Sequence, residues 1–203
     1  MVQLLSYLRE TPSQTAGPYV HIGLAPGAAG FDIYRQELGW DIIGPDTPGQ
    51  KIRVEGMVHD GTGAVVKDVL LEVWHADANG IYPHPDDPRH ADCAPGFRGW
   101  GRVITDFDTG LWAFDTIKPG PVPGRTGRVQ APHISLWIVA RGINIGLQTR
   151  LYFEDADNGD DPVLGLIEQV HRRDTLIARK TADGRYRFDI RLQGDGETVF
   201  LDV

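Results

Sequence analysis

The stretch KIRVEGMVHDGTGAVVKDVLLEVWHAD, residues 51–77, decides the fold class. Polar and apolar side chains alternate at its start, so every second residue from Ile52 to Val58 lies on one face of an extended chain. The GTG at 61–63 predicts a turn, and the apolar run VLL at 69–71 predicts a strand buried on both faces. Two consecutive β-strands are therefore expected here.

Similar short segments follow along the chain, separated by turns that contain glycine and proline. The one helix we expect is short, around residues 162–170, with Asp160 or Asp161 as its cap. Short strands at even spacing are typical of an antiparallel sandwich. We predict an all-β fold, mainly an antiparallel β-sandwich, with long loops and one or two short helices. A single domain spanning residues 1–203 is expected.

Composition narrows the classes of function. The 203 residues include 25 glycines and 14 prolines and carry a net charge of -8, a poor match for nucleic acid or an anionic membrane surface. The beginning, MVQLLSYLRETPSQ, is too polar for a signal peptide, and no stretch is apolar enough to span a bilayer. A single cysteine, Cys93, allows no internal disulfide and fits a reducing cytoplasm, where we expect the protein to act.

Two loops are candidates for a functional site. The first, residues 76–102, is long for a connection between strands and carries Tyr82, His84 and His90. The second, rich in glycine and proline, leads into the expected strand at His133. The histidines form no H-E-x-x-H pair, and no cysteine cluster, P-loop, G-x-G-x-x-G or G-x-S-x-G motif is present in the sequence. These two loops could meet at one end of the sandwich and form the mouth of a pocket.

Several motifs in one order carry a resemblance to a known family. They are TPSQTAGPY (11–19), LEVWHADANGIY (71–82), TIKPG (116–120), APHISLW (131–137), ARGIN (140–144), TRLYFED (149–155) and RFDIRLQGDGETVF (187–200). Together they resemble the intradiol ring-cleavage dioxygenases. The resemblance implies a β-sandwich in which two tyrosines and two histidines hold a non-haem ferric ion. Dioxygen then cleaves a catecholic ring between its two hydroxyl-bearing carbons and gives a muconate-type dicarboxylate.

The sequence departs from that family at the expected ligand positions. The first tyrosine falls on Tyr82 and the first histidine on His133, whereas the second tyrosine is matched by Val122 and the second histidine by Ser135. An arginine that supports the substrate in the family is matched by Gln130. Valine has no donor atom, and serine is a poor ligand at neutral pH. We therefore predict that this chain binds no metal.

The same departures resemble the iron-free subunit of family members built from two homologous chains. The resemblance then implies a beta-type partner that keeps all four ligands and the Fe(III), with residues 1–50 as an irregular arm packing on that partner. It also implies that this chain completes the partner's pocket for a carboxylate-bearing catechol and O2. The residues expected to do so are Thr15, Gly17, Pro18, Tyr19 and Arg141.

Two other readings stay open at the level of sequence. One is a stand-alone metalloenzyme that uses Tyr82 and His133 with a rescuing ligand such as His84 or His75. The other is a non-enzymatic sandwich that binds a small aromatic molecule or another protein.

Overall fold

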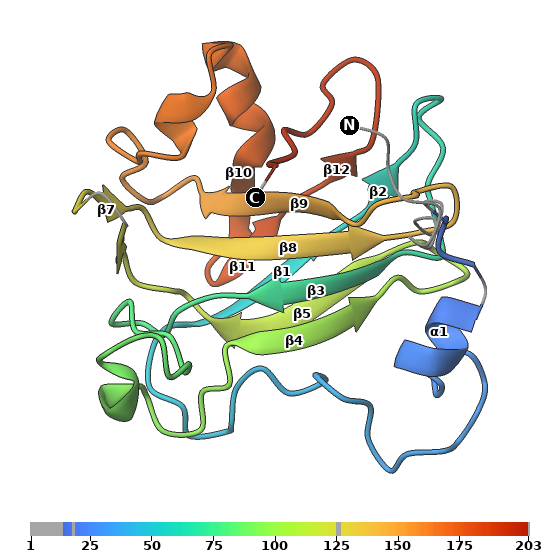
Figure 1. Cartoon of the computed structure of the whole chain (residues 1–203), viewed down its shortest axis with the longest axis horizontal. Coiled ribbons are helices and arrows are strands. Elements are labelled where there is room, and N and C mark those ends of the chain that lie inside the picture. Colours follow the sequence, from blue (N-terminus) through green and yellow to red (C-terminus); the bar gives the residue numbers. More distant parts are fainter. Residues whose placement is uncertain (1–13, 18, 125–126, 203) are drawn as a thin grey trace, which may run out of the picture.

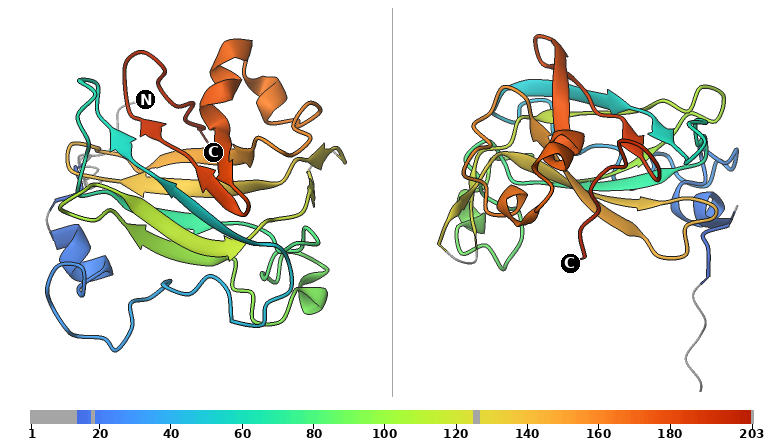
Figure 2. Two further views of the ribbon diagram at one scale, coloured as in Figure 1. Left: turned by 180° about the vertical axis from the view of Figure 1, so that it is seen from behind. Right: turned by 90° about the horizontal axis from the view of Figure 1, so that it is seen from above.

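The computed structural model describes residues 14–17, 19–124 and 127–202. Within these ranges the chain forms a β-sandwich, with β4, β3, β8 and β9 in one layer and β10, β11, β1 and β5 in the other (Figures 1 and 2). The strands are β1 (Lys51–Gly56), β2 (Val58–His59), β3 (Leu70–Trp74), β4 (Trp100–Ile104), β5 (Trp112–Ile117), β6 (Val122–Pro123), β7 (Val129–Gln130), β8 (His133–Val139), β9 (Leu147–Phe153), β10 (Ile177–Ala182), β11 (Arg185–Arg187) and β12 (Ile190–Arg191).

Most neighbouring strands are antiparallel, as the sequence predicts. The exceptions are β1 with β11, β9 with β10, and β2 with β12, which pair in parallel. Strand β10 joins the layers, because Ile177 and Ala178 pair with β9 while Arg179 and Lys180 pair with β11. The β-sandwich prediction is confirmed, and the parallel pairings are a feature that it did not contain.

The alternation along β8 explains how the core forms and where polar groups lie. Ile134, Leu136 and Ile138 point into the core between the layers and are fully buried there. Because successive side chains of a strand point to opposite faces, His133 and Ser135 lie on the outer face. The same alternation buries every second residue from Ile52 to Val58, as expected. The sandwich therefore keeps an apolar interior and leaves a polar outer face on β8.

The helical content differs from expectation in two places. Residues 162–170 do not form an α-helix; 3₁₀ turns occupy Leu164–Leu166 and Val170–Leu176 instead. Gly165 and the nearby β-branched residues lower helix propensity there, although Asp161 caps the first turn as anticipated.

The segment before β1 contains an α-helix that sequence reasoning missed, α1 (Tyr19–Leu24). After it, the chain runs along β4, where the Gly39 carbonyl accepts the Arg102 N–H at 2.9 Å, and so it covers the edge of the sheet. A further 3₁₀ turn, His90–Asp92, lies in the long loop before β4. None of the helices in the described ranges is long and apolar enough to cross a membrane.

Candidate functional site

The outer face of β8 and β9 gathers the polar side chains of the candidate site. Ser135 of β8 lies opposite Arg150 of β9 on one side and opposite Trp74 of β3 on the other. His133 lies opposite Tyr152. Paired residues and residues two apart share a face, so these five side chains stand on the same outer surface. We call His133, Ser135, Arg150 and Tyr152 the outer-face cluster.

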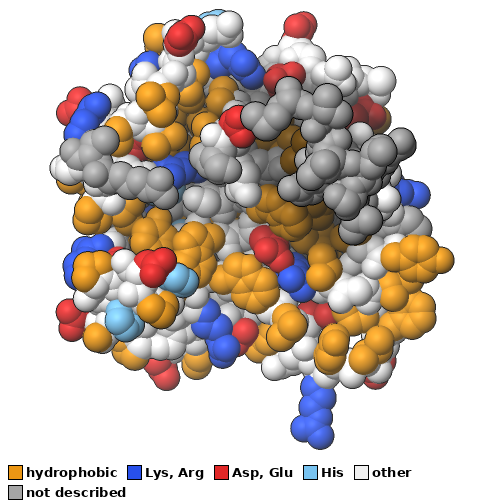
Figure 3. Space-filling model, viewed as in Figure 1, with side chains coloured by type: hydrophobic (Ala, Val, Ile, Leu, Met, Phe, Trp, Pro, Cys, Tyr) orange, Lys and Arg blue, Asp and Glu red, His pale blue; other side chains and the backbone are white. Residues whose placement is uncertain are grey.

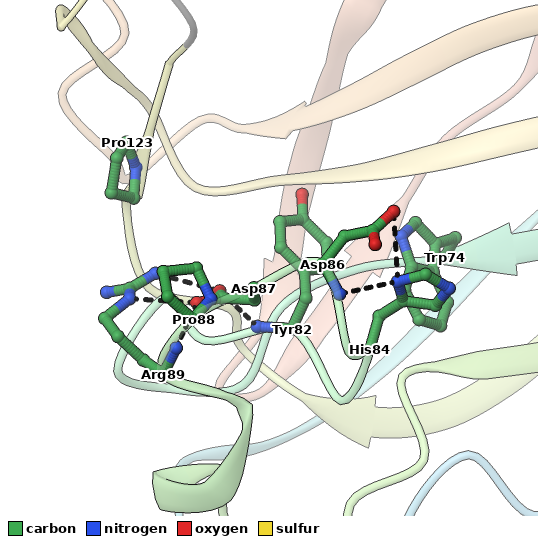
Figure 4. Close-up of a pocket in the computed structure, with 8 residues that line it drawn as sticks. All are labelled: Trp74, Tyr82, His84, Asp86, Asp87, Pro88, Arg89 and Pro123. Atoms are coloured by element: carbon green, nitrogen blue, oxygen red, sulfur yellow. Dashed lines mark hydrogen bonds and ion pairs between the residues drawn. The ribbon is translucent and has the colours of Figure 1, made fainter.

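The loop after β3 carries Tyr82 to this surface. The phenol ring stacks on Trp74, with ring centroids 5.6 Å apart and an angle of 15° between the planes. Gly80 holds the loop close to β6, because its φ of +72° suits glycine and a Cβ there would overlap the Pro121 carbonyl oxygen. A pocket of about 600 Å³ opens beside Tyr82 (Figure 4). Its lining is Trp74, Tyr82, His84, Asp86, Asp87, Pro88, Arg89 and Pro123.

The short β6–β7 ladder brings the remaining family positions to the same end. Val122 pairs with Gln130, and the Gln130 Oε1 accepts a 2.6 Å hydrogen bond from Nη1 of Arg150. The structure therefore brings together all five positions that sequence reasoning singled out: Tyr82, Val122, Gln130, His133 and Ser135.

Burial decides the protonation states of the two retained donors. It lowers the pKa of His133 to about 4, with the nearby charge of Arg150 as the next contribution. The neutral His133 ring then donates from Nδ1 to the Ala131 carbonyl oxygen at 2.7 Å. Burial raises the pKa of Tyr82, only partly offset by the charge of Arg150. At neutral pH the pair is a phenol and a neutral imidazole, with a guanidinium beside them.

A buried carboxylate, Asp161, connects several segments at this end of the sandwich through hydrogen bonds. Asp161 is 3% exposed and accepts hydrogen bonds from the N–H groups of Ala131, Val163 and Leu164 and from the Tyr152 hydroxyl. It therefore ties the start of β8, the outer-face cluster and the first 3₁₀ turn together.

Sequence reasoning did not assign roles to Arg150 or Tyr152. The signal that could have found them is the alternation in TRLYFED, in which both side chains share the face opposite Leu151 and Phe153.

The donor set does not fit a ferric ion. Val122 is 3% exposed and has no donor atom, and Ser135 faces a guanidinium across the strand pair. The rescue proposed for a stand-alone enzyme also lacks support. His75 is buried with Nε2 at 2.9 Å from the Thr116 hydroxyl and Nδ1 at 2.8 Å from the Ala76 carbonyl. No group of three or more His, Cys, Asp or Glu side chains suited to a metal occurs in the described part of the chain.

The second set of expected residues lies at the other end of β8. Thr15 accepts a 2.6 Å hydrogen bond from the Gly142 N–H through its hydroxyl, which places it beside Arg141. Arg141 forms an ion pair with Asp68 and keeps 66% of its side chain exposed. Gly17 accepts the Val20 N–H at the start of α1.

Tyr19, in the first turn of α1, is 80% exposed. Pro18 lies outside the described residues. We call Thr15, Gly17, Tyr19 and Arg141 the arm end.

The two regions are well separated. Seven residues lie between His133 and Arg141, and β8 from His133 to Val139 alone spans about 20 Å at the usual rise of a strand. Figure 1 shows β7 and α1 at opposite ends of the sandwich. The arm end is therefore not part of the pocket beside Tyr82. A small ligand that contacts the arm end does not reach the outer-face cluster of this chain.

The fold and the positions of Tyr82 and His133 agree with the class that the motifs resemble, a β-sandwich of the intradiol ring-cleavage type. A family model described as "Dioxygenase" matches residues 32–194, and the chain belongs to the intradiol dioxygenase family. It is 52% identical to the protocatechuate 3,4-dioxygenase alpha chain of Pseudomonas putida over 98% of both chains. The resemblance stated from the motifs is confirmed.

Two more distant relatives complete this picture. The protocatechuate 3,4-dioxygenase beta chain of Burkholderia cepacia is 38% identical over 74% of this chain and 67% of its own length. The solved structure of 3-chlorocatechol 1,2-dioxygenase from Rhodococcus opacus aligns with a TM-score of 0.56 and 23% identity, over 74% of this chain and 62% of that one, which shows a shared fold.

Proposed function

We propose that this chain is the iron-free alpha-type subunit of a two-chain protocatechuate 3,4-dioxygenase. The carrying observation is a donor set that lacks two ligands, in a chain 52% identical to an alpha chain over its whole length. In the proposed complex a homologous beta chain holds Fe(III), which supplies the centre where the catechol and O2 react. The product of protocatechuate is then a carboxymuconate, formed by cleavage between the two hydroxyl-bearing carbons.

The surface of the N-terminal segment supports the proposed assembly. Between α1 and β1 several large apolar side chains are exposed, although a protein of this size buries most of them. Figure 3 shows hydrophobic side chains gathered at the side of the molecule where α1 lies. The exposed apolar side chains between α1 and β1 are Phe31 at 47%, Ile33 at 63%, Tyr34 at 53%, Leu38 at 64% and Trp40 at 57% exposed. We propose that residues 1–50 pack on the beta-type partner through these side chains and leave the rest of the chain as one sandwich domain.

The arm end supplies the chemistry for a contribution to the partner's pocket. Among the described residues the exposed Arg141 guanidinium uses only Nε, in its ion pair with Asp68, which leaves its Nη donors for a ligand. A carboxylate-bearing substrate approaching a chain of net charge -8 needs such a local positive charge. We propose that Thr15, Gly17, Pro18 and Tyr19 form the wall beside Arg141 and that none of these residues is catalytic alone.

The first experiment compares the chain alone with the chain produced together with its beta-type partner. We expect iron and ring-cleavage turnover only in the complex, with one iron for each pair of chains. Stoichiometric iron and turnover in the chain alone would contradict the proposal.

The second experiment tests Arg141 within the complex. We expect Arg141→Gln to lower kcat/KM about tenfold at low ionic strength, since one charged hydrogen bond contributes ~1.5 kcal/mol or more. The loss should shrink as salt screens the charge. The matched control is Arg179→Gln, since Arg179 is an exposed arginine of β10 that pairs with Glu154. Equal kcat/KM for the two variants at every salt concentration would remove Arg141 from the pocket.

We also propose a cytoplasmic location. The support is Cys93, whose thiol pKa is raised to about 11, chiefly by burial, so it remains an unreactive thiol in a reducing compartment.

A further inference from the structure

The outer-face cluster contains a cation of its own. Arg150 stands directly across the strand pair from Ser135, where Cβ atoms are typically about 5 Å apart. Its Nη1 reaches Gln130 Oε1 at 2.6 Å. Arg150 is thus the cross-strand neighbour of one position at which this chain departs from the family, Ser135 on β8, and its guanidinium bonds another, Gln130 on β7.

The charge of Arg150 affects the pKa values of both retained donors, His133 and Tyr82. It opposes protonation of His133 and favours ionisation of Tyr82, although burial has the larger effect on each. No carboxylate among the described residues lies within ion-pair distance of Arg150. The positive charge therefore acts on its surroundings without a direct counter-ion.

We propose that the Arg150 guanidinium takes the place of a metal ion in the outer-face cluster and keeps metal cations out of it. Arginine suits this role, because it remains charged at every physiological pH and satisfies fixed acceptors such as Gln130 with its own donors. Loss of two ligands only weakens the binding of a metal ion, whereas a fixed positive charge of the chain itself repels the ion from the site. The inference concerns this chain alone and holds whether or not the proposed beta-type partner exists.

The test restores the missing donors with and without Arg150. One full-length variant carries Val122→Tyr and Ser135→His, and a second adds Arg150→Gln. The control adds Arg172→Gln instead. Arg172 lines the cavity of about 500 Å³ that Arg150 also borders, and it pairs with Glu197 at 3.3 Å. Each chain is incubated with ferric iron and dialysed, and the iron per chain and the visible absorption of a phenolate–iron bond are measured.

We expect iron near one per chain only in the variant that lacks Arg150, at least tenfold above the other two. Equal loading of all three variants would overturn the inference, because the charge would then not exclude the metal. Absence of iron from all three would overturn it as well, since removal of Arg150 would then fail to open the site.

A second measurement needs no restored ligands. We expect Arg150→Gln to raise the pKa of His133, read from its ring resonances in NMR titration and assigned by their loss in His133→Gln. Arg150→Lys should keep that pKa close to the wild-type value, because the charge is retained. The same rise in both variants would show that packing rather than charge acts on His133, and no rise in either would overturn the proposed placement of the cation.

Discussion

Removal of the Asp161 side chain should destabilise the fold strongly, because this carboxylate serves four donors at once. Three of these donors are buried: the Ala131 and Leu164 N–H groups at 2.8 and 2.9 Å and the Tyr152 hydroxyl at 3.1 Å. The fourth, the Val163 N–H at 2.8 Å, is partly buried. In Asp161→Ala all four lose their acceptor.

The magnitude follows from the three buried donors. Each costs about 1–3 kcal/mol when it is left unpaired, so the three together would cost ~3–9 kcal/mol. An adjoining cavity of about 510 Å³, lined in part by Asp161 and Ala131, lets water replace some of the lost acceptors. We therefore expect a loss of ~4 kcal/mol, which corresponds to a fall in Tm of roughly 8–16 °C for a chain of this size.

Urea denaturation of the full chain measures this change, with Asp160→Ala as the matched control. Asp160 is the exposed neighbour in the same loop, and its substitution should change the free energy of unfolding by less than ~0.5 kcal/mol. Asp161→Asn should fall between the two, at ~1–2 kcal/mol, because Oδ1 keeps its three donors while the amide faces the Ala131 N–H. A difference below ~1 kcal/mol between the two alanine variants would refute the reasoning, since buried donors cannot lose their acceptor at so small a cost.

Two further predictions concern the same end of the sandwich. Gly80→Ala should lower the free energy of unfolding by ~1–3 kcal/mol, because φ is +72° and a Cβ overlaps the Pro121 carbonyl. The control is Gly165→Ala, which has open space around it and should leave the free energy of unfolding unchanged. Equal Tm values for the two variants would contradict this prediction. The pKa of His133 is about 4 in the folded chain and 6.5 in the unfolded chain. Between these two pH values the unfolded chain binds a proton at His133 and the folded chain does not, so the free energy of unfolding decreases as the pH falls. His133→Gln should reduce this slope by up to ~1.4 kcal/mol per pH unit in urea titrations from pH 6.5 to 4.5, and an unchanged slope would count against the neutral buried ring.

The strands could be predicted because their signal is local. Alternation from Ile52 to Val58 and the apolar run at 69–71 report directly which faces are buried. The parallel pairing of β1 with β11 joins segments about 130 residues apart, so no local pattern contains it. The 3₁₀ turns after Asp161 could not be predicted either, because helix propensity separates α-helix from coil and does not identify a short 3₁₀ turn.

The candidate site was predictable only as a set of positions. Tyr82, Val122, Gln130, His133 and Ser135 were named from the resemblance, and the fold brings them to one end of the sandwich. Arg150 was not, because a charged residue in an alternating strand is most often a solvated side chain. Its meaning depends on the register that sets it opposite Ser135, which is a long-range property of the β8–β9 pair.

The distance between the two ends of β8 makes them independent, as the proposed function requires: one end departs from the family's ligand positions, while the proposed partner contact lies at the other. Substitutions more than about 10 Å apart with no shared partners act additively, and the length of β8 between His133 and Arg141 is ~20 Å. Between them Leu136 and Ile138 anchor the strand in the core, so replacement of outward side chains near His133 leaves the backbone at Arg141 in place. Polar groups left at the altered end still had to be paired, since unpaired buried ones cost stability. Arg150 and Asp161 meet that requirement by bonding Gln130 and Tyr152, so side chains of the protein itself pair the polar groups at this end of the sandwich.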